Sequence, residues 1–150
     1  MKKTIGFPKP IKKKKIKKVK ELTVTKAKKR ANTAFSIYIR TRDSIDGLGL
    51  NCYSCGKYYP AFGKGCAQAG HFIGGRHSNV VYDERNCHGQ CYMCNVVLKG
   101  NWRPYEDHMI EEYGAEVVEE LKTMDRINAH LKVNDYLEIE ELYKQKLNNL

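Results

Sequence analysis

Four cysteines in two closely spaced pairs are the residues of this chain best suited to chemistry. Two residues separate the cysteines within each pair, and a few tens of residues separate the pair Cys52 and Cys55 from the pair Cys91 and Cys94. Four thiolates complete a tetrahedron around Zn²⁺, and each pair can chelate the ion from one tight turn. The spacing therefore predicts a structural zinc site that closes the intervening loop into one unit.

The remaining cysteines leave the ligand set open. Cys66 and Cys87 lie between the two pairs, and a free buried thiol behaves as a small apolar side chain. We interpret Cys66 in this way, and Cys87 either in this way or, like the neighbouring His88, as a replacement for one zinc ligand. Four buried free thiols are the alternative to a zinc site. The sequence shows no secretory signal peptide and no transmembrane stretch, which favours a reducing cytosol over a disulfide framework.

Three polar residues within or beside this loop are of the types that phosphodiester hydrolysis requires. His71 ends an expected strand, and a neutral imidazole accepts a proton near pH 7. Asn95 directly follows the second cysteine pair, where its amide oxygen can bind Mg²⁺. Asn86 has amide donors and an acceptor, so it can brace the loop and aim His71. The alternatives are a structural or zinc-binding role for His71 and an ordinary turn role for Asn86.

Basic residues are concentrated at the N-terminus. Residues 1–30 hold fourteen Lys or Arg against one acid, residues 31–103 carry a net charge of +4, and residues 104–150 carry −7, within the +10 of the whole chain. A lysine-rich run repels itself and binds phosphates through counterion release, without reading base sequence. A solubilising tail and a targeting signal are alternatives. The expected DNA contacts in this arm are Lys12, Lys13, Lys14, Lys15, Lys17 and Lys18.

Hydrophobic periodicity predicts helices on both sides of the cysteine unit. Apolar residues recur at three- and four-residue steps over 23–41, 105–113, 115–124 and 135–147, and Asn134 is the expected N-cap of the last helix. A strand and turn are expected at 51–60. Two further strands at 68–73 and 79–82 are expected to pair across a loop that contains Gly74 and Gly75. Residues 96–98 suit a short helix.

These elements divide the chain into three expected parts. Residues 1–22 form a basic flexible arm, residues 23–103 a zinc-braced core with an N-terminal helix, and residues 104–150 an acidic helical extension. The chain is long enough for one small domain, in which zinc supplies part of the stability that a limited core cannot. The acidic extension would repel a phosphate backbone, so we assign it to packing and to a potential homodimer contact.

The order of these motifs resembles a known nuclease superfamily. His71, Asn86 and Asn95 inside the two cysteine pairs are similar to the zinc-braced form of the HNH nucleases, with Asn in place of the third His. The strings AGHFI over 69–73 and NCHGQC over 86–91, followed by Cys94 and Asn95, resemble the phage NinG family of recombination endonucleases, also called Rap. The resemblance covers most of the chain, and its central motifs are more specific than its flanks.

The resemblance implies an α+β fold with a zinc-stapled ββα-metal core. It also implies an enzyme that cuts branched recombination intermediates, such as Holliday junctions and D-loops, in the cytoplasm of a bacterial host during phage or prophage growth. Within this family pattern, His71 matches the catalytic base, Asn86 the middle motif residue and Asn95 a ligand of catalytic Mg²⁺ or Mn²⁺. The four cysteines match the zinc ligands.

One position departs from the HNH pattern. Many of these nucleases carry an acidic metal ligand directly before the first His, where this chain has Gly70. Mg²⁺ keeps several waters and takes phosphate oxygens, so few protein ligands are needed. The candidates to complete the site are Asp83, Glu84 and His77. The candidates for phosphate contacts, with surface solubility as an equal alternative, are Arg76, Arg85 and Lys99.

Two classes of function therefore compete. The first is a metal-dependent, structure-selective DNA endonuclease with a structural zinc. The second is a non-catalytic, zinc-dependent nucleic-acid-binding module, in which His71 and Asn95 serve packing or backbone contacts. Both predict salt-sensitive DNA binding, so cleavage must separate them. Neither involves a membrane.

Overall fold

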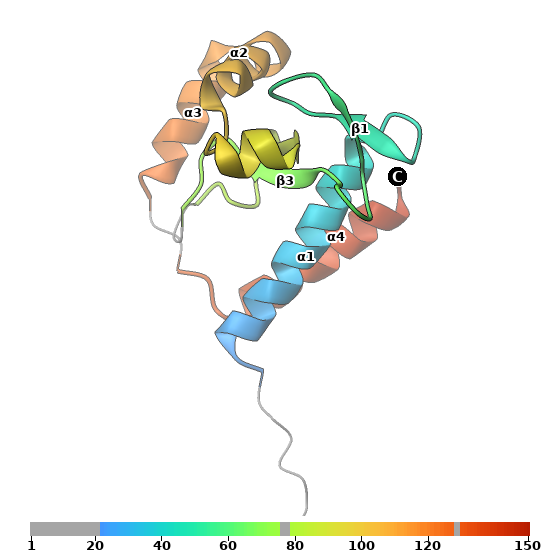
Figure 1. The fold of residues 1–150 in the computed structure, drawn as a ribbon. Coiled ribbons are helices and arrows are strands. Elements are labelled where there is room, and N and C mark those ends of the chain that lie inside the picture. The colour runs from blue at the N-terminus through green and yellow to red at the C-terminus, as the bar shows by residue number, and fades with distance from the viewer. Residues whose placement is uncertain (1–21, 76–78, 128–129) are drawn as a thin grey trace, which may run out of the picture.

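The computed structural model describes residues 22–75, 79–127 and 130–150 (Figure 1). These residues form a mixed α+β fold with two small antiparallel sheets, as expected for the fold class. The lysines of the arm, together with Arg76 and His77, lie outside the described residues. In chain order the elements are α1 (Val24–Arg42), β1 (Gly49–Asn51), β2 (Tyr58–Pro60), β3 (Gln68–His71), η1 (Glu84–Asn86), β4 (Cys87–Gln90), η2 (Met93–Val97), α2 (Trp102–Tyr113), α3 (Ala115–Asp125) and α4 (Val133–Asn148).

Helix α1 confirms the first expected helix. Thr23 is its N-cap, and the Thr23 hydroxyl accepts a hydrogen bond from the backbone N–H of Lys26 at 3.4 Å. Small residues on its buried face, such as Ala27 and Ala31, let α4 lie alongside it (Figure 1). Tyr143 of α4 packs further along α1, in a second cluster that includes Phe35 and Tyr38. The last helix of the chain therefore covers the first.

Strand β3 pairs with β4, with His71 opposite Cys87 in the register. The prediction that residues 79–82 form the partner strand is wrong, because this segment is a turn. The physical reason lies in its carbonyl groups. Val80 O accepts from the Asn86 side chain, and Val81 O is bound to the His71 ring, so they are not free to form a ladder.

The β3–β4 hairpin lies between two helical layers. Side chains alternate between the faces of a strand, and Ala69 and Cys87 pack against α1 and α4 on one face. On the other face, the buried Tyr105 hydroxyl of α2 donates to Gly70 O at 2.9 Å. Helices α2 and α3 form a second apolar cluster there, which includes Met109 and Leu121. The hairpin therefore connects both halves of the core.

The C-terminal helices occur where periodicity predicts them, with one error at a helix start. Gly114 separates α2 from α3, and its positive φ of 91° is a conformation that glycine adopts readily. The N-cap of α4 is Lys132, so the expectation for Asn134 is wrong. The Asp135 carboxylate accepts a hydrogen bond from the backbone N–H of Lys132 at 2.6 Å. This bond stabilises a helix start at Val133, directly after Lys132. Among the described residues, no helix has the length and apolar character needed to cross a membrane.

Candidate metal and nucleic-acid site

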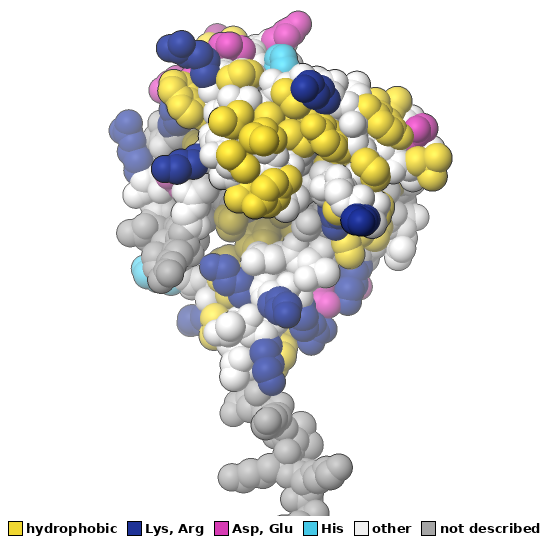
Figure 2. Space-filling model, viewed as in Figure 1, with side chains coloured by type: hydrophobic (Ala, Val, Ile, Leu, Met, Phe, Trp, Pro, Cys, Tyr) yellow, Lys and Arg dark blue, Asp and Glu magenta, His cyan; other side chains and the backbone are white. Residues whose placement is uncertain are grey.

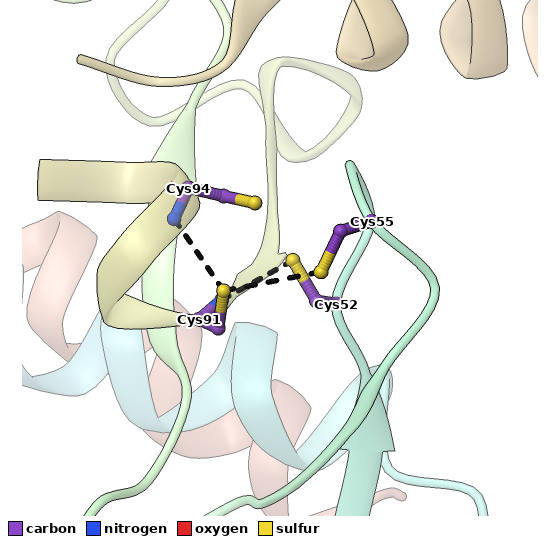
Figure 3. A group of neighbouring side chains, drawn as sticks. All are labelled: Cys52, Cys55, Cys91 and Cys94. Carbon is purple, nitrogen blue, oxygen red and sulfur yellow. Dashed lines mark hydrogen bonds between the residues drawn. The ribbon is translucent and has the colours of Figure 1, made fainter. Parts of the chain in front are cut away.

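The four cysteines of the two pairs meet at one point (Figure 3). Their Sγ atoms all lie within 4.8 Å of one another, and 4.0 Å separates those of Cys55 and Cys91. A zinc–thiolate tetrahedron with bonds of about 2.3 Å has sulfur–sulfur edges of about 3.8 Å. A small contraction would therefore complete it. These four cysteines, all free of disulfides, could bind a metal such as zinc.

Hydrogen bonds to sulfur prepare this cluster for a cation. The backbone N–H of Cys91 donates to Cys52 Sγ at 3.3 Å, and that of Cys94 donates to Cys91 Sγ at 3.4 Å. The Asn101 side chain donates to Cys94 Sγ at 3.4 Å. Burial by itself would raise the pKa of the Cys91 thiol, but hydrogen bonds, led by that from Cys94 N–H, lower it to about 7. One thiolate is therefore accessible near neutral pH, whereas burial raises the pKa of Cys52 and Cys94, so a bound metal would have to displace their protons.

The structure keeps the other ligand candidates away from the cluster. Cys87 is fully buried against α1, and burial raises its pKa. The His88 ring stacks on Tyr53 with 3.8 Å between centroids, and Arg42 Nη2 lies 3.2 Å from its Nδ1. Cys66 is half-buried, with its sulfur 3.7 Å from Arg40 Nη1. Among the described His, Cys, Asp and Glu residues, only the four paired cysteines gather as a potential metal site.

His71 has one ring nitrogen fixed and one available. Its Nε2 lies 2.8 Å from Val81 O, and a carbonyl can only accept, so Nε2 carries the proton and Nδ1 is the acceptor. No described residue contributes a hydrogen bond to Nδ1. Burial lowers the pKa of His71 below its usual 6.5. The imidazole is therefore neutral near pH 7 and able to accept a proton.

Asn86 braces the loop that holds His71. It is fully buried, its Oδ1 accepts from Ile73 N at 2.9 Å, and its Nδ2 donates to Ile73 O at 2.9 Å and to Val80 O at 3.0 Å. These bonds tie the loop just after β3 to Val80, the residue before Val81. Asn86 thus holds the backbone on both sides of the His71 ring in place.

Asn95 lies in η2, next to Gln68 and not next to His71. Its Nδ2 donates to Gln68 Oε1 at 2.8 Å. Gln68 and His71 are three residues apart on β3, so alternation directs them to opposite faces. The structure therefore separates the two side chains that the sequence placed around one cation. Gln68 was missed by sequence reasoning, because the sequence does not show which face of β3 meets η2.

Gln90 occupies the space beside Gly70. Its side chain is fully buried, and Nε2 donates to Ser54 Oγ at 2.6 Å and to Gly100 O at 2.7 Å. Its Oε1 has no partner among the described atoms. A Cβ at position 70 would lie 2.0 Å from this Oε1. Gln90, also missed from the sequence, thus fills the volume into which a larger residue at position 70 would project.

A cavity of about 520 Å³ opens beside His71 on the α1 side. Helix α1 lines it with Lys28, Asn32 and Ser36, and the loop after β3 lines it with Gly74 and Val81. The Phe35 ring lies 5.9 Å from the His71 ring, between centroids. Polar and basic side chains of α1 can therefore contact a phosphate that reaches His71.

The nearby carboxylates have structural partners. Asp83 forms an ion pair with Arg85 at 2.8 Å, and Arg85 also reaches Glu120 at 3.1 Å. Glu84 accepts from the Tyr38 hydroxyl at 2.8 Å and pairs with Lys146. Among the described residues, neither Asp83 nor Glu84 forms a hydrogen bond with Asn95. Lys99 is exposed and, within the described part of the chain, forms no ion pair.

Comparison with known proteins finds relatives over most of the chain. The family model described as bacteriophage lambda NinG protein matches residues 8–150. The protein ninG of Escherichia phage 933W is 35% identical over 124 residues, which cover 81% of this chain and 57% of that protein. The protein ninG of Escherichia phage lambda is 33% identical over 124 residues, with 81% and 56% covered. The chain thus spans a little over half the length of these relatives. No solved structure matches it significantly.

Proposed function

This chain belongs to the NinG family of bacteriophage proteins, and from that premise we propose that it is a metal-dependent endonuclease of the HNH type that cuts branched recombination intermediates of DNA. The observation that carries the proposal is the setting of His71. One ring nitrogen is bound to Val81 O, and the other has no partner among the described residues. A cavity lined by polar and basic side chains of α1 lies beside the ring.

His71 would act as the general base. Its neutral imidazole can take a proton from water at Nδ1, and Val81 O then stabilises the imidazolium through the Nε2 hydrogen bond. Asn86 holds the loop that carries Val81, so it keeps the ring in this orientation. Lys28 lines the same cavity, where a cation favours a phosphate. These residues supply the acid–base part of phosphodiester hydrolysis.

Gln68 and Asn95 are the residues that would hold a catalytic Mg²⁺ or Mn²⁺. Gln68 Oε1 already lies 2.8 Å from the Asn95 amide, and Asn95 Oδ1 has no hydrogen bond to a described residue. When bound, such an ion neutralises charge on the scissile phosphate and on the departing oxygen. Two neutral amide oxygens fit Mg²⁺ when water and phosphate oxygens complete its shell. Metal affinity should therefore be weak without DNA.

The cysteine cluster would hold a structural zinc. Zinc would fix the turn after β1 to the start of η2, and thus fix Asn95, which follows Cys94 directly. We expect elemental analysis to find about one zinc per chain. Changing Cys52 and Cys55 together to Ser should remove it, whereas Cys66→Ser should retain it because Cys66 lies outside the cluster. A full complement of zinc in the double variant would refute this ligand set.

A non-catalytic DNA-binding module is the second candidate. The separation of His71 from Asn95 favours it, because one cation would have to serve side chains on opposite faces of β3. In that case the cavity beside His71 would bind a phosphate without cutting, and zinc would only maintain the fold. Both candidates share the α1 surface as a DNA contact, so binding measurements alone cannot separate them.

A cleavage panel tests the proposed activity. Linear, flapped and four-way DNA are incubated with Mg²⁺, Mn²⁺ or EDTA, and nicking is expected on branched DNA with either metal. His71→Ala should lower the rate by about 10²-fold or more, with zinc content and DNA affinity nearly unchanged. His108→Ala, a change at an exposed histidine of α2, is the matched control and should still cut. If wild type leaves every substrate uncut, the binding module is the correct function.

A further inference from the structure

An exposed apolar surface covers η2 and the start of α2. Figure 2 shows hydrophobic side chains gathered over this region. We call it the η2 patch, and each of its side chains is between 47% and 59% exposed: Tyr92, Met93, Val96, Val97, Leu98 and Trp102. Single exposed apolar residues are ordinary, whereas a contiguous group on a small protein marks an interaction site.

The local fold explains which side chains of η2 point outward. Cys94 turns inward to the cysteine cluster, and Asn95 turns inward to Gln68. A single helical turn can bury only one side, so the residues around these two face solvent. Packing accounts for the inward residues. It does not account for the size and apolar character of the outward ones, which polar residues could replace with the buried packing unchanged.

Charge within the patch indicates its partner. No acidic residue occurs between Tyr92 and Tyr105, while Lys99 and Arg103 lie in this segment. Both cations are exposed, and neither forms an ion pair with a described residue. A negatively charged partner with flat apolar surfaces could cover the apolar side chains of the patch and also pair with Lys99 and Arg103. Unstacked nucleic-acid bases have such surfaces, and the adjoining phosphates carry the charge.

We propose that the η2 patch is a wedge that stacks on unpaired bases at the branch point of DNA. Tyr92 and Trp102 provide aromatic faces for bases, and Val97 and Leu98 provide aliphatic bulk that can separate a base step. Lys99 and Arg103 contact the adjoining phosphates. The proposal rests on the proposed function only in taking branched DNA as the ligand.

The position of the wedge relates branch recognition to the cation site. Val96 directly follows Asn95, whose side chain contacts Gln68. A branch point held on the patch therefore lies on the outer side of the helical turn whose inner side carries the amide pair. Fully stacked duplex offers no open base to the patch, whereas a junction or a flap does. The patch thus gives a structural basis for preference among DNA shapes.

A second copy of this chain fits the patch less well. A symmetric contact through the patch would bring Lys99 and Arg103 of both copies together, with no acid in the segment to offset them. Like charges brought together in this way disfavour association. DNA supplies the missing negative charge, so we assign the patch to DNA.

The test measures base unstacking without cleavage. The full chain is added to a four-way junction with 2-aminopurine at the branch, in buffer without added Mg²⁺ or Mn²⁺. Wild type should raise the fluorescence of the 2-aminopurine. Trp102→Ala and Leu98→Ser should each remove most of this rise and weaken junction affinity about ten-fold, with affinity for linear duplex nearly unchanged. Leu142→Ser on α4 changes a similarly exposed leucine and should have no effect.

The outcomes separate the wedge from the nuclease. Unchanged fluorescence and junction affinity in Leu98→Ser, in protein with the circular dichroism of wild type, would overturn the wedge even if Trp102→Ala does not fold. A Leu98→Ser change that turns a dimer into a monomer by light scattering, with junction binding intact, would overturn it in favour of a second copy. A protein that unstacks the branch base but cuts no substrate would refute the nuclease and retain the wedge.

Discussion

Gly70 and Gln90 are sterically linked across the β3–β4 hairpin. The Gln90 amide lies over the Gly70 Cα, and both of its N–H groups are used by Ser54 and Gly100. Gln90 therefore cannot swing away without leaving buried polar groups unpaired, which is costly. The absence of an acid at position 70 thus has a packing cause in this chain.

Gly70→Ala should destabilise the fold for this reason. The new Cβ would lie 2.0 Å from Gln90 Oε1, and overpacking of a tight core costs about 1–3 kcal/mol. We expect a lower midpoint in urea unfolding followed by circular dichroism. Gly74→Ala is the matched control, because its Cβ would meet no atom of the described residues within 4 Å. Equal midpoints for the two variants would show that the Gln90 side chain can move away from the new Cβ at little cost in stability.

The sequence predicts site residues by type more reliably than by partner. The four cysteines could be placed together because two short chelating loops and one ion impose their geometry. The neighbour of Asn95 could not, because it depends on which face of β3 meets η2. That face follows from the pairing of β3 with β4, a contact between segments far apart in the chain. Gln68 therefore emerges only from the structure.

Arg42 binds the last turn of α1 to strand β4. Its guanidinium donates to Glu84 O and to Cys87 O, each at 2.9 Å, and lies 3.2 Å from His88 Nδ1. The Asp43 carboxylate forms an ion pair with the same guanidinium, with Oδ1 2.7 Å from Arg42 Nε. Three backbone or ring acceptors in a fixed arrangement match the planar fork of arginine. The helix thus fixes the position of η1 and β4, and with them Asn86.

Arg42→Lys should therefore destabilise the protein although it keeps the charge. A lysine ammonium cannot reach all these acceptors, and loss of two hydrogen bonds from a charged group costs about 2–4 kcal/mol. The expected result is a lower free energy of unfolding in urea. Arg103→Lys, at an exposed arginine without a described ion pair, should change it by less than about 0.5 kcal/mol. An Arg42→Lys variant as stable as wild type would mean that the acceptors are satisfied by water.

Helices could be predicted from the sequence, whereas strand pairing could not. A helix is specified locally by the three- and four-residue spacing of Ala31, Ala34 and Tyr38, and α1 follows this pattern. Strand β3 contains only four residues, so its own sequence does not specify its partner. The side chains of His71 and Asn86 decide between them, since they take the carbonyls of residues 80 and 81. Side-chain contacts of this kind leave no periodic signal.

Opposite charges occupy different parts of the molecule. Residues 104–150, which include most of α2 and all of α3 and α4, have a net charge of −7, and residues 1–30 have +13. Figure 2 shows Lys and Arg side chains around the N-terminal part of α1 and acidic side chains near α2. DNA should therefore approach from α1, which also lines the cavity beside His71. In the sequence, the lysine-rich residues 1–21 directly precede this surface.

Deleting residues 2–20 should weaken binding to all DNA alike. The deletion removes ten lysines, and the slope of log affinity against log salt should fall by about 0.9 for each phosphate that these lysines neutralise in the intact chain. Fluorescence anisotropy over a series of NaCl concentrations, with linear and four-way DNA, measures both quantities. A chain of full length with these lysines changed to Ser separates charge from length, and it should match the deletion. Preference for the junction should persist in both, because the η2 patch lies outside the arm. A salt slope equal to that of wild type would mean that the phosphates are held by α1 and not by the arm.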